Sequence, residues 1–330
     1  MALRRRAMLG AALAAPVLGS AMLARHGWAQ SNDWPKGPIR WVVAYAAGGA
    51  ADTVARNMGA RVSEILGVQV LIDNRTGGNS VVAQSAVAQA PKDGQTFLID
   101  AANQLTNEHL VKDAPFNYEK NWLPITLMAT FPQVIAVKDE FPAKTIQEYI
   151  AAAKAKPDTI SYGTPPAAGM AHMAGEELQK RAGIKLIHTP YRGGADAARD
   201  IGANAIDSVI ITTSSIRPPL AAKKVRILAV TSLKRASVFP DVPTLAESGY
   251  PGFDMNDWSG LFAAEGVPAP LMQRMQQAVA EATKDARVKE RLDSAGAEMV
   301  ANTPAQFGAW LKVQRALLGQ LIKDANIKLG

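Results

Sequence analysis

The spacing of apolar and polar residues along this chain predicts strands that alternate with helices. A mostly apolar run over 39–45 predicts a buried strand, and helical apolar spacing follows from Asp52 until Gly67. The apolar residues over 68–72 predict the next strand. The beginning of the chain therefore predicts a strand–helix–strand unit.

The alternation continues to the carboxyl end. Further strands are expected at 97–99, 125–128, 134–137, 159–162, 186–188, 208–211 and 225–231. Further helices are expected near 80–90, 145–155, 170–183, 195–205, 270–295 and 304–325. Strands that alternate with helices of this length indicate parallel sheets with crossover connections, which is the α/β class.

The length of the chain allows two such sheets. Breaks near 131–132 and 250–252 predict a discontinuous first domain over 30–132 plus 253–330 and a second domain over 133–252. Two chain crossings between the domains would form a hinge.

Most of the basic charge lies in the first 29 residues. The formal net charge is +7, but Arg4, Arg5, Arg6 and Arg25 precede residue 30, and removing them leaves 32 basic against 29 acidic residues. The basic start, the uncharged run over 7–24 and the small residues Gly27 and Ala29 predict a secretory signal peptide over 1–29. Arg5-Arg6 also permits twin-arginine export. We therefore expect a periplasmic protein.

Composition narrows the chemistry. With no cysteine, disulfides, thiolate zinc sites and cysteine nucleophiles are excluded. The histidines show no pair at metal-binding spacing, and neither a dinucleotide fingerprint, a phosphate-binding loop nor a nucleophile elbow occurs. Dispersed basic residues argue against nucleic-acid binding. We expect no metal and no cofactor.

Two glycine-containing loops are the best candidates for a binding site. The loops over 45–53 and 163–172 each lead from a predicted strand into a predicted helix, where free backbone N–H groups and the helix dipole favour an anion. Ordinary helix starts with turn glycines are the alternative interpretation.

Single side chains leave more alternatives open. Asp52 could accept a hydrogen bond from a ligand or cap its helix. Tyr45 and Tyr191 could contact a carboxylate or simply pack. Arg192 could bind a carboxylate, although a solvated surface role is favoured for it.

A set of short segments occurs in a specific order and spacing from about Trp34 to the end of the chain. They are 34–40, 48–52, 55–56, 74–78, 90–94, 162–163, 172–176, 188–193, 228–231, 239–244, 247–252 and 258–261. In this order and spacing the segments resemble one family, the extracytoplasmic solute receptors of tripartite tricarboxylate transporters, also called the Bug family.

The resemblance implies a two-domain type II periplasmic binding protein, or Venus flytrap, with a ligand cleft between the domains. It implies a monomer that is not an enzyme and that delivers a small carboxylate to a membrane permease. The expected ligand-binding residues are Tyr45, Ala46, Gly48, Gly49, Asp52, Thr53, Asn103, Thr164, Ala168, Gly169, His172, Tyr191 and Thr212.

The loops also depart from the family pattern. Ala44-Tyr45-Ala46-Ala47 stands where prolines and a phenylalanine are usual, and Ala168-Gly169-Met170 replaces serines. Fewer hydroxyls and a tyrosine favour an apolar or aromatic carboxylate, with a dicarboxylate as another candidate. A ligand-presenting sensor component and a periplasmic hydrolase or isomerase, with Asp52 or His172 as its base, are the alternative functions.

Overall fold

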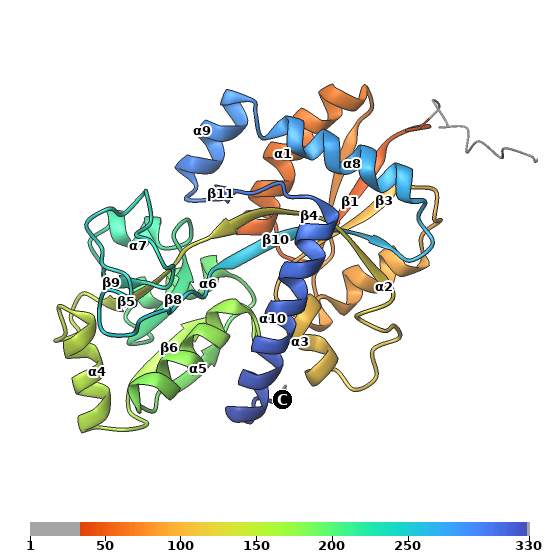
Figure 1. The fold of residues 1–330 in the computed structure, drawn as a ribbon. Coiled ribbons are helices and arrows are strands. Elements are labelled where there is room, and N and C mark those ends of the chain that lie inside the picture. The colour runs from red at the N-terminus through yellow and green to blue at the C-terminus, as the bar shows by residue number, and fades with distance from the viewer. Residues whose placement is uncertain (1–33, 329–330) are drawn as a thin grey trace, which may run out of the picture. The chain divides into compact units, whose positions relative to one another are not determined.

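Two β-sheets organise the protein. The computed structural model describes residues 34–328, which fall within one compact unit, and the signal peptide expected over 1–29 lies outside them. The first sheet has the strand order β11-β4-β10-β3-β1-β2 and the second has the order β7-β6-β8-β5-β9 (Figure 1). The expected α/β class is confirmed.

The first sheet draws on both ends of the described chain. Its strands are β1 (Ile39–Val43), β2 (Val70–Asn74), β3 (Thr96–Asp100), β4 (Trp122–Phe131), β10 (Asp257–Ala264) and β11 (Glu298–Met299). Its helices are α1 (Ala50–Leu66), α2 (Val81–Gln89), α3 (Asn103–Leu110), α8 (Ala269–Ala282), α9 (Ala286–Ser294) and α10 (Pro304–Asp324), and a short 3-10 turn spans Gly78–Ser80.

The second sheet is built from the middle of the chain. Its strands are β5 (Gln133–Lys138), β6 (Ser161–Thr164), β7 (Ile187–Pro190), β8 (Ser208–Thr212) and β9 (Val225–Val230). Its helices are α4 (Ile146–Ala155), α5 (Met170–Ala182), α6 (Gly194–Gly202) and α7 (Arg217–Ala221).

Helices cover both faces of each sheet. On β1, Ile39, Trp41 and Val43 join the apolar core under α1 and α8, while Val42 joins the core on the opposite face, where α2, α3 and α10 pack. Because successive side chains of a strand point to opposite faces, both sides of this sheet need apolar residues. In the second sheet, α6 and α7 cover one face and α4 and α5 the other (Figure 1).

The expectation of parallel sheets is wrong in part. Strands β2, β1 and β3 are parallel, as are β7, β6 and β8. However, β10 is antiparallel to both β3 and β4, and β5 is antiparallel to both β8 and β9. Each sheet therefore joins a parallel unit with crossover helices to a strand that runs the other way, β10 in the first sheet and β5 in the second, a pairing that local periodicity does not reveal.

Two neighbouring segments connect the sheets. The chain passes from β4 to β5 through Pro132 alone, and it returns between β9 and β10. The Gln133 side-chain Nε2 and the Thr231 hydroxyl both donate to the Met255 carbonyl oxygen, at 3.1 and 2.9 Å. The connections are therefore hydrogen-bonded to each other. The division into two domains with a hinge here stays a prediction.

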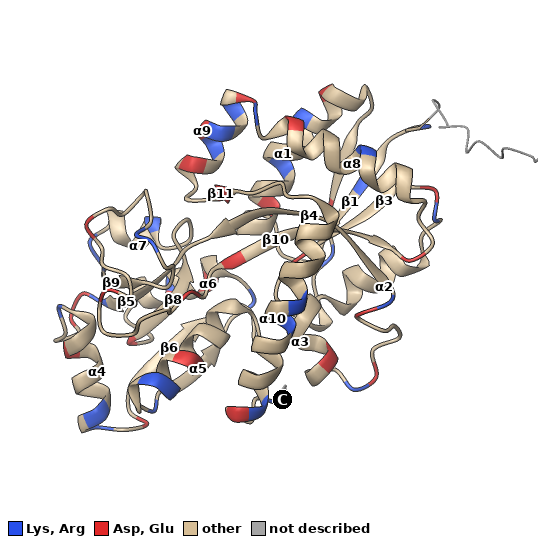
Figure 2. Cartoon of the chain, in the orientation of Figure 1, with Lys and Arg blue, Asp and Glu red and all other residues tan. Residues whose placement is uncertain are grey.

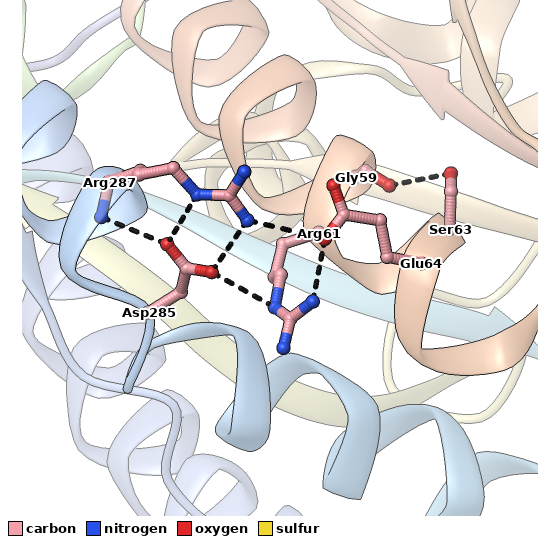
Figure 3. A network of polar contacts seen from close by, with 6 residues as sticks. All are labelled: Gly59, Arg61, Ser63, Glu64, Asp285 and Arg287. Atoms are coloured by element: carbon pink, nitrogen blue, oxygen red, sulfur yellow. Dashed lines mark hydrogen bonds and ion pairs between the residues drawn. The ribbon is translucent and has the colours of Figure 1, made fainter.

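The helix expected over 270–295 is two helices, α8 and α9. Asp285 caps α9 by accepting a hydrogen bond from the Arg287 N–H, and it also pairs with Arg61 of α1 at 3.1 Å. Glu64 completes a charged network with both arginines (Figure 3). The turn at 283–285 thus fastens α8 and α9 to α1, which carries a loop of the candidate site. The elements α3, α7, β10 and β11 were not expected from the sequence.

Candidate ligand-binding site

Five strand-to-helix loops meet at one cavity. They connect β1 to α1, β3 to α3, β6 to α5, β7 to α6 and β8 to α7, so two come from the first sheet and three from the second. Each follows the carboxyl end of a strand, which is where open α/β sheets bind ligands. The two loops that the sequence indicated, over 45–53 and 163–172, both contribute residues to its walls.

This cavity, the first chamber, has a volume of about 80 Å³. It is lined by Tyr45, Ala46, Gly49, Ala50, Ala51, Ala101, Ala102, Asn103, Pro165, Pro166, Gly169, Met170, Arg192, Gly193, Gly194, Thr212, Ser215, Asp257, Trp258 and Ser259. A water needs roughly 10–15 Å³ by this measure, so the chamber has room for the polar head of a small molecule.

The amino-terminal ends of four helices border the first chamber. Helices α1, α3, α5 and α6 begin after Gly49, Ala102, Gly169 and Gly193, and none has a side-chain hydrogen bond at its cap. Uncapped helix starts leave N–H donors free and carry partial positive charge. Their convergence favours an anion in the chamber.

Arg192 adds a full positive charge to the same walls. Its side chain is exposed and has no ion-pair partner among residues 34–328. It also lines a second chamber of about 690 Å³, which shares Tyr45, Ala46, Asn103 and Pro166 with the first. The sequence favoured a solvated role for this arginine; the structure places it at both chambers.

A buried polar network positions Tyr45 and Asn103. The Tyr45 hydroxyl lies 3.0 Å from Asp100 Oδ1 and 3.1 Å from Asn103 Oδ1, and Gln84 Nε2 donates to Asp100 Oδ2 at 2.7 Å. Burial raises the pKa of Asp100 to about 6, although hydrogen bonds from Ala101, Gln84 and Tyr45 oppose the shift. These hydrogen bonds hold Tyr45 and Asn103 in place, and both residues line the first chamber.

Three residues of the first chamber have buried polar side-chain atoms without partners. Asn103 Nδ2, Trp258 Nε1 and Ser259 Oγ make no hydrogen bond within residues 34–328. Buried polar groups in proteins are normally paired, and an unpaired one costs about 1–3 kcal/mol. A bound molecule with polar groups would satisfy them.

The structure places the expected residues in two groups. One group lies on cavity walls: Tyr45, Ala46, Gly49, Asn103, Gly169 and Thr212 line the first chamber and Tyr191 the second, and Gly48 borders a neighbouring groove.

The other group, Asp52, Thr53, Thr164, Ala168 and His172, lies behind the walls and braces the loops. Asp52 Oδ2 accepts from the Gly48 N–H and from Arg56 Nε, both at 2.9 Å, and Thr53 donates to the Gly49 carbonyl. Although burial opposes ionisation, the Arg56 and Gly48 hydrogen bonds lower the pKa of Asp52. Asp52 is thus neither the helix cap, which is Gly49, nor part of the chamber wall.

The second loop is held in the same way. The Ala168 N–H donates to His172 Nδ1 at 3.1 Å, and the Ala168 carbonyl accepts from the Thr106 hydroxyl of α3 at 3.1 Å. Thr164 is hydrogen-bonded to His188 Nε2 at 2.7 Å. The Thr106 contact links the first sheet's helix to the second sheet's loop, and the polar groups of Thr164, Ala168 and His172 that make these hydrogen bonds are used inside the protein.

Sequence reasoning missed part of the wall. Ser215, Asp257 and Ser259 received no role, and the start of α3 was not recognised as a helix. The segment 258–261 was noted as a motif, which is the signal that could have found β10. Its place beside β3 follows from pairing between segments more than 150 residues apart.

Two stacked histidines lie behind the second loop. The rings of His172 and His188 are 3.8 Å apart and nearly parallel. Burial, together with the neighbouring His172 ring, lowers the pKa of His188 to about 4, against the attraction of Glu176. His188 therefore remains neutral where an exposed histidine would take up a proton.

We expect this histidine to make the protein less stable in acid. Between pH 6.5 and 4 the unfolded chain binds a proton at His188 that the folded chain does not, so the free energy of unfolding falls as pH falls through this window. After a discount for partial exposure, the loss is about 1–2 kcal/mol. Urea denaturation at several pH values measures it. A His188→Gln variant should show a flatter profile, and equal slopes in both proteins would contradict the assignment.

Other classes of site find no support in the described part of the chain. Across residues 34–328, His, Asp and Glu side chains do not gather in threes or more at a possible metal site. No helix in the same range combines the length and apolar character needed to cross a membrane. Basic and acidic side chains mix over the helices of both sheets (Figure 2).

Comparison with known proteins extends this picture. The family model described as tripartite tricarboxylate transporter family receptor matches residues 54–327. The chain is 35% identical over 326 residues to a protein of Pseudomonas sp. strain P51 described as "UPF0065 protein in tcbD-tcbE intergenic region", covering 98% of this chain and 95% of that protein.

Solved structures show the same fold. The periplasmic binding protein BugD is 31% identical, with a TM-score of 0.81 over 89% of this chain and 99% of BugD. The R. palustris protein Rpa4515, solved with adipate, is 28% identical, with a TM-score of 0.84 over 90% of this chain and 99% of that protein.

Proposed function

This chain belongs to the tripartite tricarboxylate transporter receptor family, and from that premise we propose that it captures a small carboxylate in the first chamber and delivers it to the transporter's membrane permease. The family consists of periplasmic solute-binding receptors, so the protein is a receptor rather than an enzyme. The hydrolase or isomerase alternative is thereby set aside.

The convergence of four uncapped helix starts on one chamber carries the proposal. The N–H groups at these starts that make no hydrogen bond inside the protein can donate to a carboxylate oxygen, and Arg192 supplies the full charge that the helix dipoles lack. A neutral sugar would leave this positive potential uncompensated. The adipate bound by the relative of known structure supports the same chemical class.

Capture would involve the two sheets closing on the ligand. The chamber walls come from both sheets. The chain passes between the two sheets through the hydrogen-bonded segments around Pro132 and Met255. Two domains, over 30–132 plus 253–330 and over 133–252, would then rotate about these connections. Closure would bring the ligand into contact with both pairs of helix starts.

A thermal-shift screen tests ligand capture. The purified protein is heated with mono-, di- and tricarboxylates, aliphatic and aromatic, and with neutral sugars and amines as controls. A carboxylate at a thousandfold excess over its Kd stabilises by about 4 kcal/mol, which raises the Tm by roughly 8 °C for a chain of this size. The proposal would be contradicted if a sugar stabilised the protein, or if none of the carboxylates did.

Delivery to a permease needs a separate test. Cells that lack the gene should fail to take up the carboxylate that the screen identifies, and a plasmid copy should restore uptake. Normal uptake in the deletion strain would instead favour a receptor that presents its ligand to a sensor.

A further inference from the structure

A carboxylate side chain stands in the wall of the chamber assigned to a carboxylate ligand. Asp257 is the first residue of β10, is partly exposed and lines the first chamber. Its Oδ1 accepts from the Trp258 N–H at 2.9 Å, and no Lys, Arg or His within residues 34–328 forms an ion pair with it. A second negative charge in an anion site requires an explanation, since like charges at close range repel.

The charge of Asp257 is present at neutral pH. Burial raises its pKa to about 6, and the Trp258 N–H opposes this shift. The side chain is therefore mostly ionised at pH 7.5. A ligand that covered it without donating a hydrogen bond would leave an unpaired charge out of contact with water, which is costly.

Ser259 stands beside Asp257 on the same face of the strand. Residues two positions apart on a strand point to the same side, and both residues line the first chamber. The Ser259 side chain is 1% exposed, and its hydroxyl has no partner among residues 34–328. Trp258, between them, packs its ring on Phe307 and Trp310. The β10 wall thus offers a charged acceptor and a hydroxyl, whereas the helix starts offer N–H donors.

We infer that the first chamber selects carboxylates that carry a hydroxyl or ammonium group on the carbon next to the carboxylate, and that Asp257 accepts a hydrogen bond from that group. The inference rests on the proposed function. We place the donor next to the carboxylate because the helix starts and Asp257 line the same chamber of about 80 Å³. Asp257 would then determine specificity, while the helix starts and Arg192 supply affinity for the carboxylate.

Matched series of acids test this selection. Each series has one carbon skeleton with hydrogen, hydroxyl or ammonium at carbon 2: propanoate, lactate and alanine; phenylacetate, mandelate and phenylglycine; succinate, malate and aspartate. Affinities are measured by calorimetry at pH 7.5. In the series that binds, the hydroxyl or ammonium member should bind at least tenfold more tightly than the unsubstituted acid, because a hydrogen bond to a charged group contributes about 1.5–3 kcal/mol.

The Asp257→Ala variant should change the two kinds of ligand in opposite directions. The donor-bearing acid loses its acceptor and should bind about tenfold more weakly, while the unsubstituted acid loses a repelling neighbour and should bind more tightly. A merely structural role would weaken both. Asp241→Asn, which removes the charge of an exposed side chain outside both chambers, should change neither affinity.

The possible failures are distinguishable. If unsubstituted acids bind wild-type protein as tightly as their hydroxyl and ammonium partners, or if Asp257→Ala shifts all affinities the same way, the selection by Asp257 is wrong while carboxylate capture stands. If no carboxylate in the series or in the screen binds, the proposed function fails and this inference fails with it.

Discussion

Gly49→Val is expected to abolish carboxylate binding while the protein still folds. Gly49 precedes α1 at the edge of the first chamber, with φ −78° and ψ 177°, a conformation that valine adopts readily. A Cβ there would lie 3.3 Å from the Ala46 carbonyl oxygen, so the loop needs to shift only slightly. The free energy of unfolding should therefore fall by about 1 kcal/mol or less.

The effect on binding is large because the site depends on the approach of a ligand to bare backbone. Two methyl groups at residue 49 would fill part of a chamber of about 80 Å³ and would cover the first N–H groups of α1. We expect the affinity to fall by more than about a thousandfold. This corresponds to a loss of more than roughly 4 kcal/mol of binding free energy. Calorimetry with the carboxylate found in the screen measures it, beside urea denaturation of the same variant.

Gly49→Ala is the matched control for size. It adds only the Cβ, so its affinity should lie between those of wild-type protein and Gly49→Val. Wild-type affinity in the valine variant would show that the ligand does not reach the start of α1, and the assignment of the first loop would then be wrong.

Arg192→Gln is expected to weaken carboxylate binding about a hundredfold. The guanidinium is the positively charged side chain in the walls of both chambers, and it has no carboxylate partner among residues 34–328 that would compete for it. A hydrogen bond between charged groups contributes about 1.5–3 kcal/mol, and the upper part of this range corresponds to a hundredfold change in Kd. The stability of the unliganded protein should hardly change, because the side chain is exposed.

A control with the same charge change separates local from general electrostatics. Arg217, an exposed residue at the start of α7, lines neither chamber, so Arg217→Gln should leave the affinity unchanged within a factor of about two. If both variants lose affinity equally, the carboxylate responds to the net charge of the protein rather than to a contact with Arg192.

The local pattern of apolar residues determined most of the secondary structure. The run at 39–45 became β1 because both faces of that strand are buried, and Gly67 and Gly183 end α1 and α5 in the left-handed conformation that glycine tolerates. The sequence also located the two loops that begin at Tyr45 and Gly163, since strand ends that lead into helices are local features. The family could be identified because its motifs keep their order and spacing along the chain.

What the sequence could not decide depends on contacts between distant segments. Strand β10 lies between β3 and β4 only because the chain returns to the first sheet after building the second, so Asp257 and Ser259 reach the chamber from a part of the chain with no local signal for a site. The hydrogen bonds of Asp52 and His172 to their loops are local by contrast, since they join residues four apart, Gly48 to Asp52 and Ala168 to His172. Periodicity along the chain reports which face of an element is buried, whereas the partner that buries it, and the cavity that this leaves, are set by tertiary packing.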